Sequence, residues 1–232
     1  MRATSAHEPL ALIRRLYEAW NTGDVAGAAA LLSPTVTWES FGASQPAAGP
    51  HGLKATLAGG SGGTWRLSPV SIDLLIGVGK HVVAFSRRSG PEGGDEAERL
   101  EVWTLSDGRA VHYRGYPLDE GLAVLSATTG DRKLEVACRA VLAFNRGDRA
   151  RWAGYFEADA RGFAEQLGGE RLDDVAILAS TFDALVISAL HHLDEASAVP
   201  LNLVIAFAGD HARRVLAYAT PEAAVAAAAG PG

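Results

Sequence analysis

The stretch Asn21-Thr22-Gly23-Asp24 decides the fold, because it returns as Asn145-Arg146-Gly147-Asp148, 124 positions later and in the same context. In both places a run of apolar residues at helical spacing precedes the motif, and a second short amphipathic run follows it. The ends of the copies also match, since Tyr116-Pro117-Leu118-Asp119-Glu120 resembles Tyr218-Ala219-Thr220-Pro221-Glu222 at an offset of 102. Self-similarity on this scale predicts two copies of one small domain.

The two offsets differ by 22 residues, so the second copy is the shorter one. We assign the missing residues to the counterpart of 42–63, which is expected to carry a third helix at about 51–58. The 232 residues fit two domains, predicted at 1–126 and 127–232 and joined near 125–130. The second domain is therefore expected to lack the third-helix segment.

Each copy is predicted to begin with helices and to continue with antiparallel strands, which defines an α+β fold with a curved sheet packed on N-terminal helices. In copy one we expect helices over 9–21, 25–32 and 51–58, and strands over 35–41, 65–76, 81–88, 97–105 and 109–116. In copy two we expect helices over 131–145 and 148–156, and strands over 160–166, 174–181, 184–192, 201–207 and 212–218.

Composition excludes several classes of protein. The chain is 48% hydrophobic and 21% charged, and no apolar run approaches the length of a membrane span. Its net charge of −6 and its scattered arginine pairs, Arg87-Arg88 among them, indicate solvated faces and no nucleic acid partner. The single cysteine, Cys138, excludes an internal disulfide and favours a reducing compartment. With no secretion signal at the N-terminus, we expect a cytoplasmic protein.

Three segments of copy one carry a family resemblance. They are Tyr17-Glu18-Ala19-Trp20-Asn21-Thr22-Gly23-Asp24, then Ala29-Ala30-Leu31-Leu32-Ser33-Pro34, then Val36-Thr37-Trp38-Glu39. In this order they resemble a SnoaL-like domain of the NTF2-like superfamily, and the resemblance extends more weakly to copy two. It implies two tandem NTF2-like (cystatin-like) cones, each a bent sheet wrapped against helices around a pocket. It does not imply one activity, because relatives include isomerases, cyclases, hydrolases and non-enzymes.

The resemblance also locates possible working groups. Isomerase-like members place a tyrosine, an aspartate base and a protonated acid at positions that fall here on Leu16, Ser40 and Glu101. Only the acid is retained, and Tyr17 lies one residue from the tyrosine position. Cyclase-like members often carry a carboxylate in the last strand, where this chain reads Tyr113-Arg114-Gly115. No single family mechanism is therefore intact.

The candidate catalytic residue is Glu101, which strand alternation places on one face with Trp103. Buried among aromatic side chains, Glu101 is expected to stay protonated at neutral pH and to donate a proton or a hydrogen bond. The candidate substrate-binding residues share a place near this pocket: Tyr17, Trp38, Ser40, Trp65, Trp103 and Arg114. Aromatic walls with few polar groups suit a flat, mostly apolar ligand. No metal site and no cofactor are expected.

Two functions follow from these residues. The first is a cofactor-independent isomerase, cyclase or hydrolase acting on a small, mostly apolar carbonyl or polyketide-like compound. The second is a non-catalytic protein that binds a small hydrophobic molecule. In either case copy two is expected to act as an internal dimerisation partner, leaving open a further homodimer. Because copy two lacks a carboxylate at the counterpart of Glu101, we expect the main pocket in copy one.

Overall fold

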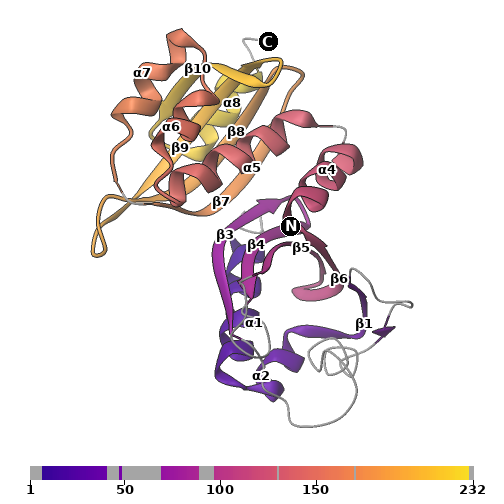
Figure 1. Cartoon of the computed structure of the whole chain (residues 1–232). Helices are drawn as coiled ribbons and strands as arrows, with labels where there is room; N and C mark the ends of the chain where they lie inside the picture. The colour runs from indigo at the N-terminus through magenta and orange to yellow at the C-terminus, as the bar shows by residue number, and fades with distance from the viewer. Residues whose placement is uncertain are drawn as a thin grey trace. The chain divides into compact units, whose positions relative to one another are not determined.

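The computed structural model describes residues 7–40, 47–48, 69–88, 97–129, 131–169 and 171–229 of the chain. It divides into two compact units, Met1–Gly121 and Leu122–Gly232 (Figure 1). The division falls five residues before the expected one, because an unpredicted helix, α4 (Leu118–Thr129), runs through the predicted linker. The expected third helix at 51–58 lies outside the described residues.

The N-terminal unit begins with α1 (Glu8–Thr22) and α2 (Val25–Ala30), close to the predicted spans. Helix α1 has Pro9 in its first turn, where the missing N–H costs nothing, and Gly23 ends it in the left-handed region at φ 74°. Asp24 then caps α2 by accepting a 2.8 Å hydrogen bond from the Gly27 N–H. The motif Asn-x-Gly-Asp is therefore a helix stop followed directly by a helix start.

Among the described residues of the N-terminal unit, six strands form the sheet, in the order β3-β4-β5-β6-β1-β2. They are β1 (Leu32–Ser40), β2 (Ala47–Ala48), β3 (Val70–Val78), β4 (His81–Arg88), β5 (Ala97–Ser106) and β6 (Arg109–Pro117). The run β3-β4-β5-β6 is antiparallel, as predicted, but β1 joins β6 in parallel. The sheet is thus not wholly antiparallel, a feature that no local pattern in the sequence indicates.

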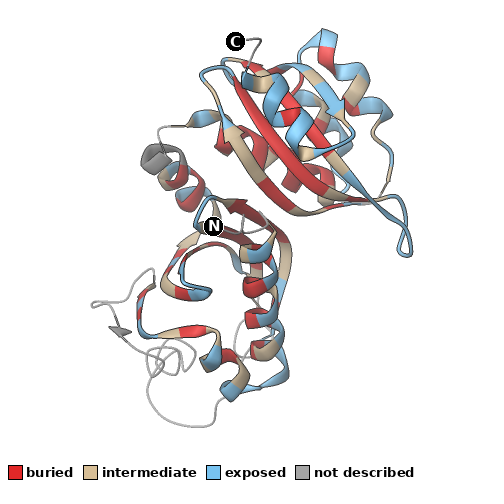
Figure 2. Ribbon diagram, turned by 180° about the vertical axis from the view of Figure 1, so that it is seen from behind, coloured by how far each residue is buried: buried red, intermediate tan, exposed pale blue. Residues whose placement is uncertain are grey.

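The C-terminal unit contains three helices before its strands: α5 (Arg132–Asn145), α6 (Arg149–Gly154) and α7 (Ala158–Gln166). Its sheet is the antiparallel meander β7 (Arg171–Ser180), β8 (Ala184–His192), β9 (Ala198–Ala208) and β10 (His211–Tyr218). A last helix, α8 (Pro221–Ala229), packs on one face of this sheet through Ala224 against Val186 and Val204. The central strands are largely buried (Figure 2).

The two copies of the motif hold the same place in their units. The Asn21 side chain bonds both the N–H and the C=O of Val70, each at 2.9 Å, and so ties the end of α1 to the start of β3. Asn145 bonds the N–H and C=O of Leu172 at 2.8 and 2.9 Å, at the start of β7. Asp148 caps α6 as Asp24 caps α2. The repeat in sequence is therefore a repeat in structure, and both units have the predicted α+β architecture.

The segment over 160–166 corrects one prediction, since it forms helix α7 and not a strand. Its sequence, ADARGFAEQ, is rich in helix-forming residues, and its buried positions Ala160 and Ala164 have helical spacing. What copy two lacks is most of strand β1. Leu32 pairs with Ala110 at the start of β1, and its counterpart Phe156 makes only an isolated parallel bridge to Ala212 before α7 begins. The 22 missing residues thus remove a strand, while a third helix is present.

Candidate functional site

Glu101 lies at the centre of a buried polar cluster on the inner face of the N-terminal sheet. Its side chain is fully buried. The hydroxyl of Tyr113 donates to one carboxylate oxygen at 2.8 Å, and the guanidinium of Arg88 forms a short ion pair with the same oxygen. The hydroxyl of Tyr17 donates to the other oxygen. The Trp103 indole N–H in turn donates to the Tyr17 hydroxyl at 2.9 Å. The cluster connects α1 to three adjacent strands.

Aromatic rings enclose this cluster. Trp103 lies edge-on to Trp38 at a centroid distance of 5.6 Å and contacts Tyr113 at 4.7 Å. Tyr17 meets Trp103 edge-on at 6.1 Å. All four rings are at most 2% exposed. Trp38, Tyr113 and Trp103 share one row of the sheet through the pairings of β1 with β6 and of β6 with β5.

The proton positions in the cluster follow from its charges. Burial, together with the nearby Glu101 carboxylate, raises the pKa of Tyr17 well above its ordinary value, and it does the same to the pKa of Tyr113. Burial alone would lower the pKa of Arg88, but the facing carboxylate raises that pKa overall. Both phenols are therefore neutral donors and Arg88 is a cation. The Glu101 carboxyl group thus faces two hydroxyl donors and the Arg88 cation, and its expected role as a proton donor stays a prediction.

Gly115 makes room for the Tyr113 ring. A Cβ at Gly115 would lie 2.7 Å from the Tyr113 hydroxyl oxygen and 3.2 Å from the ring carbon that bears it. This steric requirement explains why Gly115 is a glycine, at a position where cyclase-like relatives often carry a carboxylate. It allows Tyr113 to reach across its own strand to Glu101, which pairs with Gly115 in the sheet.

Of the predicted site residues, the structure brings Tyr17, Trp38, Glu101 and Trp103 into one cluster. It does not bring Arg114 there. That side chain is 46% exposed and donates to Glu39 at 2.5 Å from the opposite face of the sheet. The backbone of Ser40 pairs with Gly115, in the same row as Glu101. Trp65 lies outside the described residues.

Sequence reasoning missed Tyr113 and Arg88. We interpreted Arg87-Arg88 as a solvated face, but only Arg87 fits that description. Its side chain is 39% exposed and reaches Asp73, whereas the Arg88 side chain is 17% exposed and pairs with Glu101. One signal was present in the sequence, since alternation along β4 puts Arg88 on the same face as Val82 and Ala84. A buried carboxylate on the neighbouring strand needs a cation, and this face supplies one.

Three polar atoms near the cluster have no hydrogen-bond partner among the described residues. They are the indole Nε1 of Trp20, the Nε of Arg88 and the hydroxyl of Ser86, and all three atoms are buried. The Arg88 guanidinium carbon lies 5.0 Å from the centre of the Trp20 ring. Ser86 precedes Arg88 by two residues on β4 and so shares its face. Two of these groups can only donate, which leaves this part of the site short of an acceptor.

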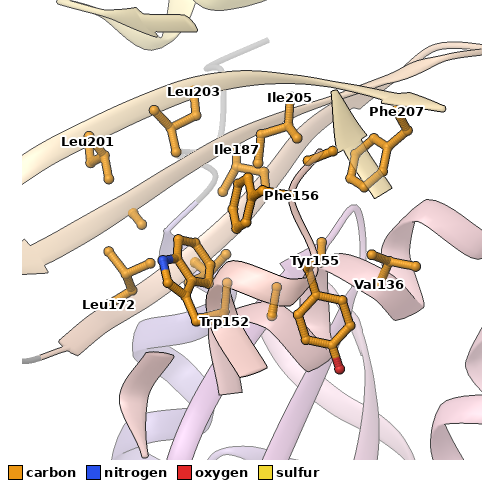
Figure 3. A pocket seen from close by; sticks show the side chains of 16 residues that line it. Val136, Trp152, Tyr155, Phe156, Leu172, Ile187, Leu201, Leu203, Ile205 and Phe207 are labelled. Carbon is orange, nitrogen blue, oxygen red and sulfur yellow. The ribbon is translucent and has the colours of Figure 1, made fainter. Parts of the chain in front are cut away.

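A pocket is present in the C-terminal unit, whereas we expected the main pocket in copy one. Helices α5 and α6 and all four strands line it, with Val136, Trp152, Phe156, Ile187 and Phe207 among the side chains (Figure 3). Its surface is wholly apolar, and its volume of about 30 Å³ leaves room for a water-sized atom or two. Such a cavity has nothing to hold water. Residues 49–68 of copy one, which include its expected third helix, lie outside the described residues. The main pocket expected in copy one therefore stays a prediction.

Comparisons with known proteins agree with this architecture. Residues 13–113 match the SnoaL-like domain family, from α1 to most of β6. The N-terminal unit is therefore a SnoaL-like domain. The C-terminal unit repeats its first two helices and its antiparallel run of four strands, with α7 where β1 would lie. A search of curated proteins found no match.

Solved structures of NTF2-like proteins resemble about half of the chain. A putative ketosteroid isomerase from Kribbella flavida is 17% identical, covering 47% of this chain and 76% of its own, with a TM-score of 0.41. TerC, co-crystallised with polyporic acid, is 21% identical over 51% of this chain and 97% of its own, with a TM-score of 0.40. Bal32a, from a soil-derived mobile gene cassette, is 21% identical over 50% of this chain and 98% of its own, with a TM-score of 0.43. At these TM-scores the likenesses say nothing about the chemistry of this chain.

Two further observations concern the described residues alone. None of their helices is long and apolar enough to cross a membrane. Their histidine, cysteine, aspartate and glutamate side chains form no group of three or more arranged to hold a metal ion. The cytoplasmic location and the absence of a nucleic acid partner remain predictions from composition.

Proposed function

We propose that the N-terminal SnoaL-like domain binds a small, mostly apolar molecule that carries a carbonyl or carboxylate oxygen. The observation that carries this proposal is the pair of buried donors without a partner among the described residues, Trp20 Nε1 and Arg88 Nε. An unsatisfied buried donor costs about 1–3 kcal/mol, so a site with two of them favours a ligand that supplies an acceptor. Trp20 itself, with the Tyr17 ring 6.3 Å away, offers an aromatic surface that suits a flat, apolar body.

In this proposal Glu101 positions the donors. Its carboxylate fixes the Arg88 guanidinium through the ion pair, so that the Nε–H of Arg88 stays beside the Trp20 ring. The hydroxyl groups of Tyr17 and Tyr113 each donate a hydrogen bond to one oxygen of the Glu101 side chain. Both Glu101 oxygens already have partners within the protein, whereas the donors of Trp20 and Arg88 do not, which is why binding has more support than catalysis.

A second candidate function is cofactor-independent proton transfer, as in an isomerase or cyclase. It is favoured by one observation, namely that two phenols and a carboxylate form one continuous buried network around Glu101. A base of this kind would remove a proton next to the ligand carbonyl, and a phenol would donate to the developing oxyanion. In this reaction Glu101 would be the base, and Tyr17 or Tyr113 the donor to the oxyanion.

The binding proposal is tested with three flat probes that differ in their oxygen: 2-acetonaphthone, 2-naphthoate and naphthalene. Nuclear magnetic resonance titration of the full chain, followed at the assigned tryptophan indole N–H signals, reports binding near Trp20. We expect the two oxygen-bearing probes to shift the Trp20 signal and to bind more tightly than naphthalene. Trp20→Phe removes the unpartnered N–H, so it should weaken those two probes about fivefold and leave naphthalene unchanged.

The matched control is Trp103→Phe, which removes an N–H that already has a partner in Tyr17. It should lower stability without removing the preference for oxygen. Equal affinity for all three probes would contradict the proposal. Catalysis is tested separately by exchange of the methyl protons of 2-acetonaphthone in D₂O. Exchange that is accelerated by the chain and abolished by Glu101→Gln would identify an enzyme.

A further inference from the structure

The last strand of the C-terminal unit has an open edge. Strand β10 pairs with β9 along one side. On its other side the described residues contribute only the bridge from Phe156 to Ala212, with hydrogen bonds from the Ala212 N–H to Tyr155 and from the Glu157 N–H to Ala212. Beyond Ala212 no described strand pairs with this edge, which runs through Arg214 to Tyr218.

The N-terminal unit shows what occupies the equivalent edge. There β1 lies along β6 in parallel, with Thr37 opposite His112 and Ser40 opposite Gly115. The bridge pairs Leu32–Ala110 and Phe156–Ala212 match at offsets of 124 and 102, the offsets of the repeat itself. The offset of 102 makes residues 214–217 the counterparts of 112–115. The exposed edge of β10 is therefore the place that β1 fills in the other copy.

A groove runs between this edge and helix α7. Its strand side includes Arg214, Val215 and Leu216. Its helix side includes the apolar residues Ala160 and Phe163 and, at the start of the helix, the acidic residues Glu157 and Asp159. Leu216 is 37% exposed. An open strand edge beside a helix is the arrangement in which an extended peptide adds to a sheet, with main-chain hydrogen bonds for affinity and alternate side chains for specificity.

The side chains along the edge define the peptide. Val215 pairs with Ile205, which lines the apolar pocket, so Val215 faces the helices and its neighbours Arg214 and Leu216 face the other way. In the N-terminal unit the β1 residues on that outer face include Thr37, opposite His112, and Glu39, opposite Arg114. Glu39 also lies 3.7 Å from His112, the counterpart of Arg214. An apolar residue toward Val215 and Phe163 and an acidic residue toward Arg214 would reproduce the β1 pattern.

We propose that the β10 edge binds an extended peptide strand, parallel to β10, in which apolar residues alternate with polar ones that include an acidic residue. The charge of the edge supports a peptide over a second copy of the same edge, since pairing two β10 strands would bring Arg213 and Arg214 of both copies together. Among the described residues Arg213 lies 3.9 Å from Asp183, and no ion pair is present at Arg214.

The probe is a fluorescein-labelled peptide with the sequence of residues 32–40, LSPTVTWES, because this strand fills the equivalent edge in the N-terminal unit. Fluorescence anisotropy with the full chain measures affinity, and amide hydrogen exchange locates the site. We expect saturable binding and slowed exchange over 213–218. Arg214→Glu should weaken binding about tenfold. Arg171→Glu, the same charge change on the opposite edge strand β7 of this unit, should leave it unchanged.

Two further measurements separate main-chain pairing from other contacts. A peptide N-methylated at alternate residues keeps its side chains but loses ladder hydrogen bonds, so it should bind at least tenfold more weakly. Equal affinity of the N-methylated peptide, or protection outside α7 and β10, would overturn the proposal, as would no binding of the LSPTVTWES peptide. Concentration-dependent dimerisation with protection of β10 in the absence of peptide would instead assign this edge to a second copy.

Discussion

The Asn145 side chain holds the Leu172 backbone by two hydrogen bonds, one to its N–H and one to its C=O. Asn21 does the same to Val70. The two residues of each pair are 49 positions apart in the N-terminal unit and 27 in the C-terminal unit, a difference equal to the 22 residues missing from copy two. The shortened connection therefore returns the chain to the same point beside the helix.

Replacing either asparagine should destabilise its unit. Asn145→Ala removes both bonds and leaves two part-buried backbone groups of Leu172 without a partner, at a cost of about 1–3 kcal/mol. Urea unfolding followed by circular dichroism measures the loss. The control is Thr22→Ala, whose exposed hydroxyl bonds only carbonyls of its own helix and should cost less than about 0.5 kcal/mol. Equal losses in the two variants would contradict the role assigned to asparagine.

Neutralising Glu101 should cost far more than neutralising Glu39. Glu101→Gln leaves the Arg88 cation buried without a counter-charge, which typically costs about 3–5 kcal/mol. Glu39 pairs with Arg114 at the surface, and Glu39→Gln should cost at most about 1 kcal/mol. Thermal unfolding compares the two. Adding Arg88→Met to Glu101→Gln should restore part of the stability. A double variant that loses at least as much stability as the two single variants together would argue against the ion pair.

Gly115→Ala should displace the Tyr113 ring. The new methyl group would lie 2.7 Å from the Tyr113 hydroxyl oxygen, and the hydrogen bond to Glu101 keeps that ring from moving freely. We expect a loss of about 1–3 kcal/mol from overpacking. Because Tyr113→Phe removes the oxygen that clashes, the double variant should lose less than the sum of the two single variants. Strict additivity in a double-mutant cycle would show that the two side chains do not interact.

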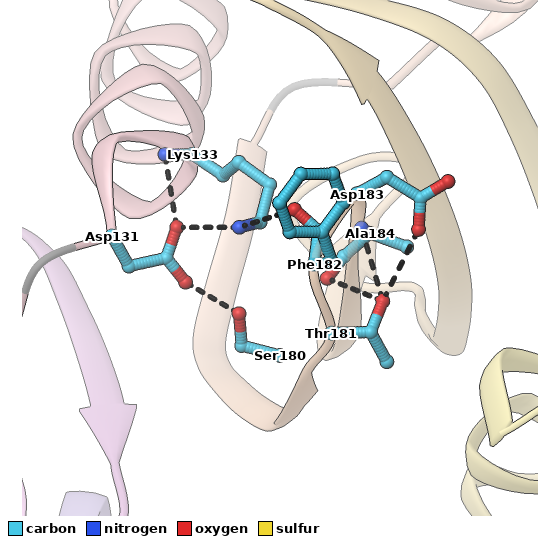
Figure 4. Close-up of polar contacts among 7 residues, drawn as sticks. All are labelled: Asp131, Lys133, Ser180, Thr181, Phe182, Asp183 and Ala184. Carbon is cyan, nitrogen blue, oxygen red and sulfur yellow. Dashed lines mark hydrogen bonds and ion pairs between the residues drawn. The ribbon is translucent and has the colours of Figure 1, made fainter.

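Asp131 should make stability depend on pH. It caps α5 by accepting from the Lys133 N–H at 3.0 Å, lies 2.9 Å from the Lys133 ammonium, and accepts from the Ser180 hydroxyl (Figure 4). Burial acts to raise the pKa of Asp131, but the Ser180 and Lys133 contacts lower that pKa overall. The stabilisation is thus complete above the unfolded pKa of about 3.9 and is lost as the pH falls through the lower folded value.

The stability difference between the unchanged chain and Asp131→Asn should therefore be largest near neutral pH and shrink below about pH 4. Unfolding in urea at a series of pH values measures it. Arg132→Gln is a suitable control, because Arg132 and its partner Asp210 are exposed and close to the same helix end. A difference that grows on acidification would contradict the assignment.

The sequence by itself determined the local elements and their repetition. The spans of α1 and α5 follow from apolar spacing and from the glycines that end them, and β4 and β8 run over the predicted residues 81–88 and 184–192. The burial of Glu101 with Trp103 follows from strand alternation. These features depend on residues close together in the chain, whose conformational preferences are read directly from their spacing.

Only the tertiary structure decided which distant residues meet. Arg88 is a buried partner of Glu101 and Arg114 a surface partner of Glu39, although both are arginines on strands of the same sheet. The short apolar pattern of the segment 160–166 is compatible with a helix or a strand, so tertiary contacts select between them. Here the segment forms α7, which packs against β10. The loss of β1, and with it the open edge of β10, depends on pairing across the sheet, which local spacing does not encode.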